Sequence, residues 1–315
     1  MSMRVFNLIK VSLIFLLAIG CTGPIIPTST PTSPTTTLPA IITPVSPESS
    51  PTLITDVITG TLTMGNYQYV MECSGEGSPT VLLLGGRAAT WQPIQEEINR
   101  STRTCVFDHR GSRSTPLTAE EIAKNVHTLL NKTKMSGPYV LVGFSVGGYI
   151  ARLFAASYPS EVAGMALLDS SHEDQNARFL AALPTETSGD CQELKYYRAE
   201  LQGPHMLQVT SQISLDFDAS AEEVRAIEKN LGSLPLVVLS AGRSEWPDCF
   251  PSEAREGLDQ AWLDMQNDLA SLSTNSTHLV AEESGHNFAE QPEIVIDAIQ
   301  RVVQSVQTET TSPVP

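Results

Sequence analysis

The stretch of sequence that decides the fold is YVLVGFSVGG, residues 139–148. Its first four residues form a continuous apolar run of the kind that makes a buried strand, and an amphipathic helical segment follows. Between the two, Gly143, Ser145 and Gly147 match the pattern Gly-x-Ser-x-Gly. A serine on a sharp strand-to-helix turn requires small residues two positions away on either side, because larger side chains there would collide with the neighbouring backbone. The pattern therefore predicts a nucleophile at Ser145.

Strand-like and helix-like segments alternate along most of the chain from about residue 54. Short apolar strands are expected at 60–64, 67–73, 81–84, 104–107, 139–144, 163–168, 236–239 and 278–281. Helices are expected at 93–100, 118–132, 146–158, 252–272 and 293–306. This alternation predicts an α/β fold, a mostly parallel sheet flanked by helices on both faces.

The alternation breaks between residues 171 and 234. Helical stretches at 192–201 and 221–231 are separated there by Pro and Gly, with no clear buried strand. We therefore expect this segment, about 171–234, to form a mainly helical cap inserted over the sheet.

A serine nucleophile needs a base, and His286 is the candidate among the six histidines. It follows the last predicted strand and a small Ser-Gly turn near the end of the chain. His172 competes because it also lies near a strand end, but it precedes any acid late in the chain. The sequence therefore predicts that His286 takes the proton of Ser145.

The acid that orients this histidine must lie between Ser145 and His286 if the order is serine, acid, histidine. Asp169 ends the strand that follows the serine helix, whereas Glu245 and Asp248 follow the strand at 236–239. Both loops lie at the carboxyl edge of the predicted sheet, where ligands collect. The residues alone leave all three carboxylates as candidates.

The segment from about Leu62 to Val306 resembles the α/β-hydrolase superfamily, particularly its esterase and proline-iminopeptidase-like members. The matching stretches are 81–86 (VLLLGG), 107–114 (FDHRGSRS), 139–153 and 283–286 (ESGH). The resemblance implies hydrolysis of a small acyl substrate, a carboxylic ester above all, through a covalent acyl-Ser145, with no metal and no cofactor. The chain departs from the family at Gly85, where a His is usual, and at Arg113, where a Gly is usual.

The resemblance also implies further site residues. The block LDSSH at 168–172 recurs in the subgroup that looks most similar, which favours Asp169 over Glu245 as the acid. The backbone N–H groups of Arg87 and Val146 are implied to form the oxyanion hole.

The first 21 residues have the features of an export signal. Arg4 and Lys10 precede a short apolar run that ends in Gly20 and Cys21. The sequence LAIGC at 17–21 resembles the lipobox of bacterial lipoproteins, in which the cysteine is lipidated. We therefore expect an extracytoplasmic protein anchored to the membrane through Cys21, with a secreted protein carrying an ordinary signal peptide as the alternative.

The rest of the chain divides by composition. Residues 22–53 are rich in Thr, Pro and Ser and read as an extended linker, because such a stretch cannot bury a core. The α/β domain is expected at 54–307, and a disordered tail at 308–315.

The remaining cysteines predict disulfides. Cys73, Cys105, Cys191 and Cys249 make an even number in an exported chain, which allows three pairings. Metal binding is the weaker interpretation, because no two of them have C-x-x-C spacing. Cys73 and Cys105 flank strands that are expected to lie near the same end of the sheet, which favours the pair Cys73–Cys105. Cys191 lies in the expected cap and Cys249 after the loop with Glu245 and Asp248, so the pair Cys191–Cys249 would hold the cap down.

The net charge of the chain is −16. A surface this acidic repels phosphate backbones, so nucleic acid is not expected as a partner. Two alternatives to an esterase remain. One is an aminopeptidase or acyltransferase on the same residues, for which Glu173, Asp174 and Glu193 could receive a substrate amine. The other is a catalytically silent surface protein that binds a ligand.

Overall fold

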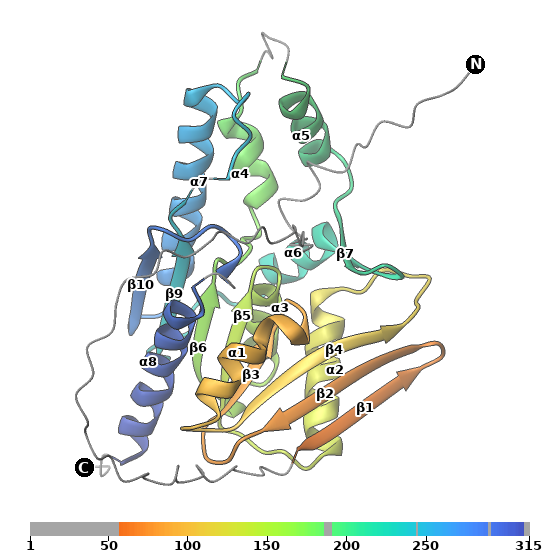
Figure 1. Ribbon diagram of the computed structural model, residues 1–315, viewed down its shortest axis with the longest axis vertical. Coiled ribbons are helices and arrows are strands. Elements are labelled where there is room, and N and C mark those ends of the chain that lie inside the picture. Colours follow the sequence, from red (N-terminus) through yellow and green to blue (C-terminus); the bar gives the residue numbers. More distant parts are fainter. Residues whose placement is uncertain (1–56, 186–190, 244, 289–290, 312–315) are drawn as a thin grey trace, which may run out of the picture. The chain divides into compact units, whose positions relative to one another are not determined.

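The computed structural model describes residues 57–185, 191–243, 245–288 and 291–311 (Figure 1). Contacts divide the chain into Met1–Ile54 and Thr55–Pro315, and all the described residues belong to the second unit. The predicted export signal, the lipobox with Cys21 and the linker at 22–53 lie outside the described residues.

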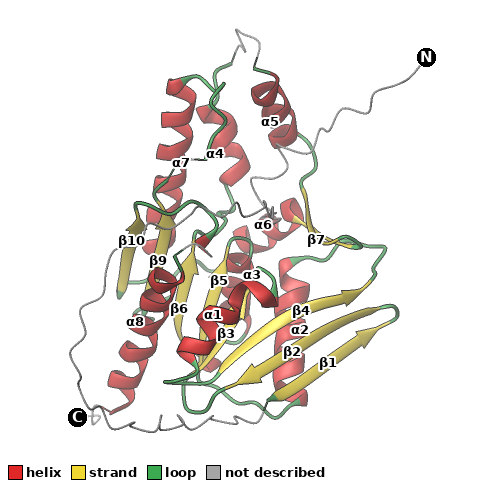
Figure 2. Cartoon of the chain, in the orientation of Figure 1, coloured by secondary structure: helices red, strands yellow, loops and turns green. Residues whose placement is uncertain are grey.

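An eight-stranded sheet forms the centre of this unit (Figure 2). Its strands, in spatial order, are β1 (Ile58–Met64), β2 (Tyr67–Ser74), β4 (Thr104–Gly111), β3 (Thr80–Leu84), β5 (Tyr139–Phe144), β6 (Val162–Leu168), β9 (Leu236–Ala241) and β10 (Ser276–Ala281). β1 pairs antiparallel with β2, and β2 with β4; the other neighbours are parallel. The parallel strands therefore all end at one edge, and the expected mostly parallel sheet is confirmed.

Helices cover both faces of the sheet. On one face lie α1 (Ala88–Ile98) and α8 (Pro292–Thr311); on the other lie α2 (Ala119–Lys132), α3 (Gly147–Ser157) and α6 (Phe217–Arg225). The central strands explain why two cores form. Val81 and Leu83 of β3 belong to the core under α1 and α8, whereas Leu82 and Leu84 belong to the other core, because side chains alternate along a strand. A strand buried on both sides reads as the continuous apolar run seen in the sequence.

Two helices are longer than expected. α1 begins at Ala88 and contains Pro93 in its interior. Its added first turn is anchored by the buried Trp91, whose indole N–H donates to the carbonyl of Gly85 at 2.7 Å. α8 continues to Thr311, so the first residues of the expected tail are helical, and no Gly or Pro interrupts the sequence in between.

The segment at 171–234 is less helical than expected. It contains α4 (Gln175–Ala182), α5 (Gln192–Gln202) and α6, but also a hairpin of β7 (Met206–Thr210) and β8 (Ile213–Asp216). Ile213 and Leu215 alternate with polar residues on β8 and are almost fully buried in the core under α2 and α3. The expectation that this segment holds no buried strand is therefore wrong, because two apolar residues in a four-residue strand give too short a pattern to recognise.

Two helices of this segment, α4 and α5, lie beyond the carboxyl edge of the sheet (Figure 1). α4 packs against α5 and against α7 (Ser252–Ala270), a helix from later in the chain. Figure 1 shows α4, α5 and part of α7 beyond the ends of the central strands. These three helices therefore lie next to the loops that follow the central strands (Figure 1).

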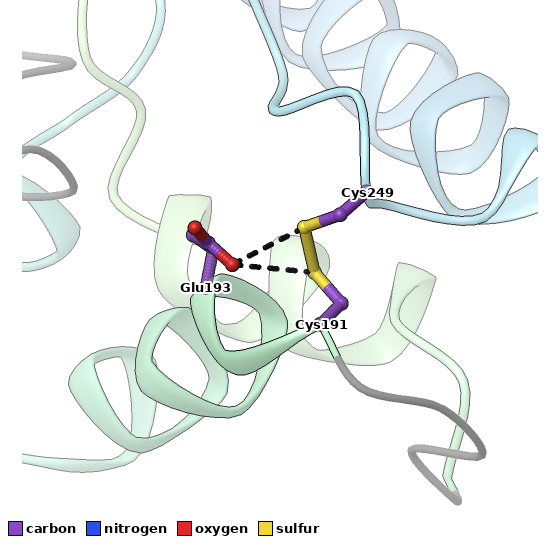
Figure 3. Close-up of side chains that lie close together, drawn as sticks. All are labelled: Cys191, Glu193 and Cys249. Carbon is purple, nitrogen blue, oxygen red and sulfur yellow. Dashed lines mark hydrogen bonds between the residues drawn. A yellow bond between two sulfur atoms is a disulfide. The ribbon is translucent and has the colours of Figure 1, made fainter.

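Two disulfides are present. Cys73 and Cys105 are direct partners in the register of β2 and β4, and both are fully buried. Cys191 at the start of α5 is joined to Cys249 in the loop after β9, on the surface (Figure 3). Disulfides persist in oxidising compartments, which indicates an extracytoplasmic location.

No helix in the part of the chain that the structure describes is long and apolar enough to cross a membrane.

A buried ion pair joins α3 to the start of the segment at 171–234. The Arg152 guanidinium donates to both oxygens of Glu173, at 2.7 and 3.3 Å, and both side chains are almost fully buried. Lys229 adds a third contact at 2.7 Å. Burial alone would raise the pKa of Glu173, but the hydrogen bond and charge of Arg152, aided by Lys229, hold it well below its usual range.

We expect Glu173→Gln to lower the free energy of unfolding by about 3 kcal/mol, because the substitution leaves Arg152 buried without its counter-charge. Urea denaturation at neutral pH measures this. The matched control is Glu120→Gln, which removes an exposed pair with Lys124 on α2 and should cost less than about 1 kcal/mol. Equal effects of the two substitutions would contradict the interpretation.

The same pair predicts a pH dependence of stability. Because the folded pKa of Glu173 lies below the unfolded one, its stabilising effect is complete above the unfolded value. The effect is lost as the pH falls from there towards the folded pKa. The wild type should therefore lose more unfolding free energy between about pH 5 and pH 3 than Glu173→Gln does.

Candidate active site

The turn between β5 and α3 carries Ser145. This residue has a φ of 54°, in the left-handed region that non-glycine residues seldom adopt. Hydrogen bonds hold the strained conformation: the Ser145 N–H donates to the carbonyl of Leu168, and its own carbonyl accepts from the N–H of Ser171, both at 3.1 Å. Ser145 is only partly buried, so the turn presents its side chain at the edge of the sheet.

The two glycines of the motif permit the close approach of this turn to its neighbours. A Cβ on Gly143 would lie 2.7 Å from the carbonyl oxygen of Gly147, and a Cβ on Gly147 would lie 2.2 Å from the carbonyl oxygen of Leu84. Neither neighbour is a side chain that could move away. The spacing of the motif thus has the steric cause that the sequence suggested.

His286 lies in the loop after β10, beside this turn. Its ring stacks on that of Phe144, the residue before Ser145, with centroids 5.0 Å apart and planes 26° from parallel. Its Nδ1 lies 2.5 Å from Oδ2 of Asp169. An ionised carboxylate can only accept, so Nδ1 carries the proton and Nε2 is left with its lone pair, as a general base requires.

Asp169 comes from the loop directly after β6. Its side chain is almost fully buried, and its Oδ1 accepts two hydrogen bonds. One comes from the N–H of Ala241 at the end of β9, at 2.9 Å, and the other from the indole N–H of Trp262 on α7, at 2.8 Å. With Oδ1 occupied in this way, Oδ2 faces His286.

The other candidate acids lie differently. Glu245 accepts from the backbone N–H of His286 at 3.4 Å, and its second oxygen lies 3.7 Å from the guanidinium of Arg243. Asp248 is exposed in the loop that leads to Cys249. Of the three carboxylates that the sequence left open, the structure brings Asp169 to the imidazole ring.

His172, the competing histidine, has a structural environment. Its side chain is buried, and its Nδ1 accepts a hydrogen bond from the N–H of Asp174 at 3.0 Å. Burial lowers the pKa of His172 below its ordinary value, and the neighbouring Glu173 opposes this only in part. The ring is therefore held as a neutral acceptor within the segment after β6.

The amides suggested for an oxyanion hole both precede helices. Arg87 is the N-cap of α1 and Val146 the N-cap of α3. Within the described residues, neither N–H donates to another group of the protein. Gly85 has a φ of 80°, and a Cβ there would lie 2.4 Å from the carbonyl oxygen of Phe144, which explains why this loop has no room for the histidine usual in the family.

Two aromatic residues of the site were missed at the level of sequence. Trp262 lies 93 positions from the aspartate to which it donates, on a helix with ordinary amphipathic character. Phe144 occupies a variable position of the serine motif, so nothing marks it as the platform for His286. Both contacts depend on tertiary packing, and no local sequence pattern predicts them.

Two of the three acidic residues considered for an amine-binding site form ion pairs. Glu173 pairs with Arg152, and Asp174 lies 3.1 Å from Arg225. Glu193 lies beside the surface disulfide, with its carboxylate 3.3 Å from the sulfur of Cys249 (Figure 3). That group does not offer thiolate ligands to a metal, because both of its sulfurs are bonded to each other.

Comparison with known proteins agrees with this architecture. The sequence profile of the family described as alpha/beta hydrolase fold matches residues 79–244, and the chain belongs to this family. The family and the fold support a hydrolytic function.

Individual relatives are distant. The uncharacterized protein YqjL of Bacillus subtilis is 28% identical over 229 residues, which cover 69% of this chain and 79% of the relative. Monoacylglycerol lipase ABHD6 of Bos taurus is 27% identical over 115 residues, which cover 33% of this chain and 34% of the lipase. Among solved structures, alpha/beta hydrolase domain-containing protein 10 from mouse has a TM-score of 0.53 at 15% identity, covering 79% of this chain and 99% of the mouse chain. This last similarity shows the fold alone.

Proposed function

We propose that the protein is a serine hydrolase that cleaves carboxylic esters through an acyl-Ser145 intermediate. The observation that carries the proposal is the contact of His286 with the buried Asp169, directly beside the strained turn that presents Ser145. A nucleophile, a base in the required tautomer and an orienting acid are the parts that acyl transfer needs.

In the proposed mechanism, Nε2 of His286 takes the hydroxyl proton of Ser145 as its oxygen attacks the ester carbonyl. The negative charge that develops on the carbonyl oxygen is bound by the backbone N–H groups of Arg87 and Val146, aided by the N-terminus of α3. His286 then gives its proton to the departing alcohol. The acyl group remains bound to Ser145 as the acyl-enzyme. A water molecule, deprotonated by His286, then attacks the acyl carbon. The bond from this carbon to Oγ of Ser145 breaks, the acid leaves, and His286 returns the proton to Oγ.

An ester is favoured over a peptide with a free amino terminus. An aminopeptidase needs carboxylates free to receive the substrate amine, and Glu173 and Asp174 are committed to ion pairs within the protein. The distant match to a monoacylglycerol lipase points in the same direction.

We also propose the arrangement in which this chemistry operates. Residues 54–307 form the hydrolase domain, with the segment at 171–234 as a cap beside the strand ends. The linker at 22–53 would hold this domain away from a membrane in which lipidated Cys21 is inserted. The Cys191–Cys249 disulfide supports an oxidising compartment for the cap.

A substrate panel tests the proposed activity. We expect purified protein to hydrolyse p-nitrophenyl esters, with one preferred acyl length, and to leave aminoacyl p-nitroanilides intact. Cleavage of the anilides without the esters would replace the proposal by an aminopeptidase. Inertness of folded protein towards both would favour the silent binding protein.

A further inference from the structure

The carboxylate of Asp169 is held by groups from three separate parts of the fold. Oδ1 accepts from the Ala241 N–H and from the Trp262 indole, and Oδ2 contacts His286. The donor of Ala241 is its backbone N–H at the end of β9, which no side-chain substitution other than proline removes. Trp262 is the one donor to Asp169 among the described residues that comes from a helical side chain.

The indole has two physical effects on this carboxylate. Two donors on Oδ1 fix the rotation of the carboxyl group, which keeps Oδ2 aimed at Nδ1 of His286. The indole N–H also withdraws negative charge from the carboxylate, so the carboxylate stabilises a protonated His286 less strongly than it otherwise would. Both effects act on the base and neither requires Trp262 to touch the substrate.

Trp262 is itself held by the helices at the carboxyl edge of the sheet. Its ring lies 5.9 Å from that of Phe179 on α4, and Phe179 meets Trp246 edge-on at 5.5 Å. α4 in turn packs along α7. The position of the indole, and through it that of Asp169, therefore depends on how α4 and α7 pack.

From these contacts we infer that Trp262 is a positioning residue, which orients Asp169 and through it His286, and links the packing of α4 and α7 to the base. The inference rests on the proposed function for its kinetic meaning, but the contact itself can be tested without activity.

Trp246 provides a matched control. It also contacts Phe179, and its indole N–H also donates to a carboxylate, that of Asp259 at 2.6 Å. Asp259 is exposed on α7 and Trp246 lies in the loop after β9, and neither forms one of the hydrogen bonds to Asp169. Trp246→Phe thus removes the same chemical group from the same aromatic cluster but leaves Asp169 untouched.

The first test reads the contact directly. The chain has three tryptophans, so ¹⁵N-labelled protein gives three indole N–H signals, which single Trp→Phe substitutions assign. We expect Asp169→Asn to shift the Trp262 signal and to leave those of Trp91 and Trp246 in place. An unmoved Trp262 signal would overturn the inference, even if Trp262→Phe proved too unstable to study.

The second test reads the effect on the base. The rate of inactivation by a fluorophosphonate is measured from about pH 5 to pH 9, the range in which a histidine titrates. We expect Trp262→Phe to slow the reaction about tenfold, as the loss of one hydrogen bond to a charged group would, and to move the acid limb of the profile to higher pH. The KM for an ester should be unchanged, because the inferred role involves no contact between Trp262 and the substrate. Trp246→Phe should stay within about twofold of the wild type in all respects.

Failure of this inference is distinguishable from failure of the proposed function. Equal kinetic behaviour of the two tryptophan variants, with an active wild type, would overturn the role of Trp262 alone. A folded wild type that does not react would overturn the proposed function, and the indole signals would still decide whether Trp262 holds Asp169.

Discussion

Asp169→Asn is expected to lower kcat/KM for ester hydrolysis by about ten-thousandfold, the effect seen when the acid of such a triad loses its charge. An amide at this position can donate to Nδ1 of His286, which favours the tautomer in which Nε2 carries the proton. The base would then be unable to accept from Ser145. The loss should fall on kcat, because the substitution leaves the substrate contacts unchanged.

Glu245→Gln is the matched control, because Glu245 also lies next to His286 and was the rival acid. Its contact is one long hydrogen bond from the backbone, worth about 1 kcal/mol, so we expect a fall of less than about tenfold. Steady-state kinetics on the best ester of the panel measures both variants. A large loss with Glu245→Gln and a small one with Asp169→Asn would move the acid to the loop after β9.

Ser145→Ala is expected to reduce kcat by about a millionfold, to the residual level that binding and the oxyanion hole provide. His286→Ala should cause a loss of similar size, and the double variant should be hardly worse than either alone, because the two residues act as a unit. Ser157→Ala, which removes an exposed hydroxyl from the other end of α3, should behave as the wild type. Single-turnover measurements on an activated ester can follow such slow variants. Losses of Ser145→Ala and His286→Ala that add in the double variant would contradict a shared step.

Much of this fold is predictable from the sequence because its signals are local. The central strands β3, β5, β6 and β9 are largely continuous apolar runs, and the turn at Ser145 requires Gly143 and Gly147 within four residues of one another. The short hairpin of β7 and β8 was missed because its few alternating residues carry too little periodicity.

The sequence does not decide which carboxylate orients His286. Asp169 and Glu245 follow adjacent strands of the sheet, β6 and β9, so both come to the same edge. Only the side-chain geometry separates them: Asp169 reaches the ring of His286, and Glu245 reaches its backbone. Trp262 is further still from prediction, because its contact with Asp169 exists only once α7 has packed at the carboxyl edge.

Mass spectrometry of the protein after treatment with a fluorophosphonate tests the central claim most directly. The claim predicts one covalent adduct on the wild type, located by proteolysis on the peptide that contains Ser145. It also predicts no adduct on Ser145→Ala, and slow labelling of Asp169→Asn. An unmodified wild type with native thermal unfolding, or an adduct on a residue other than Ser145, would contradict it.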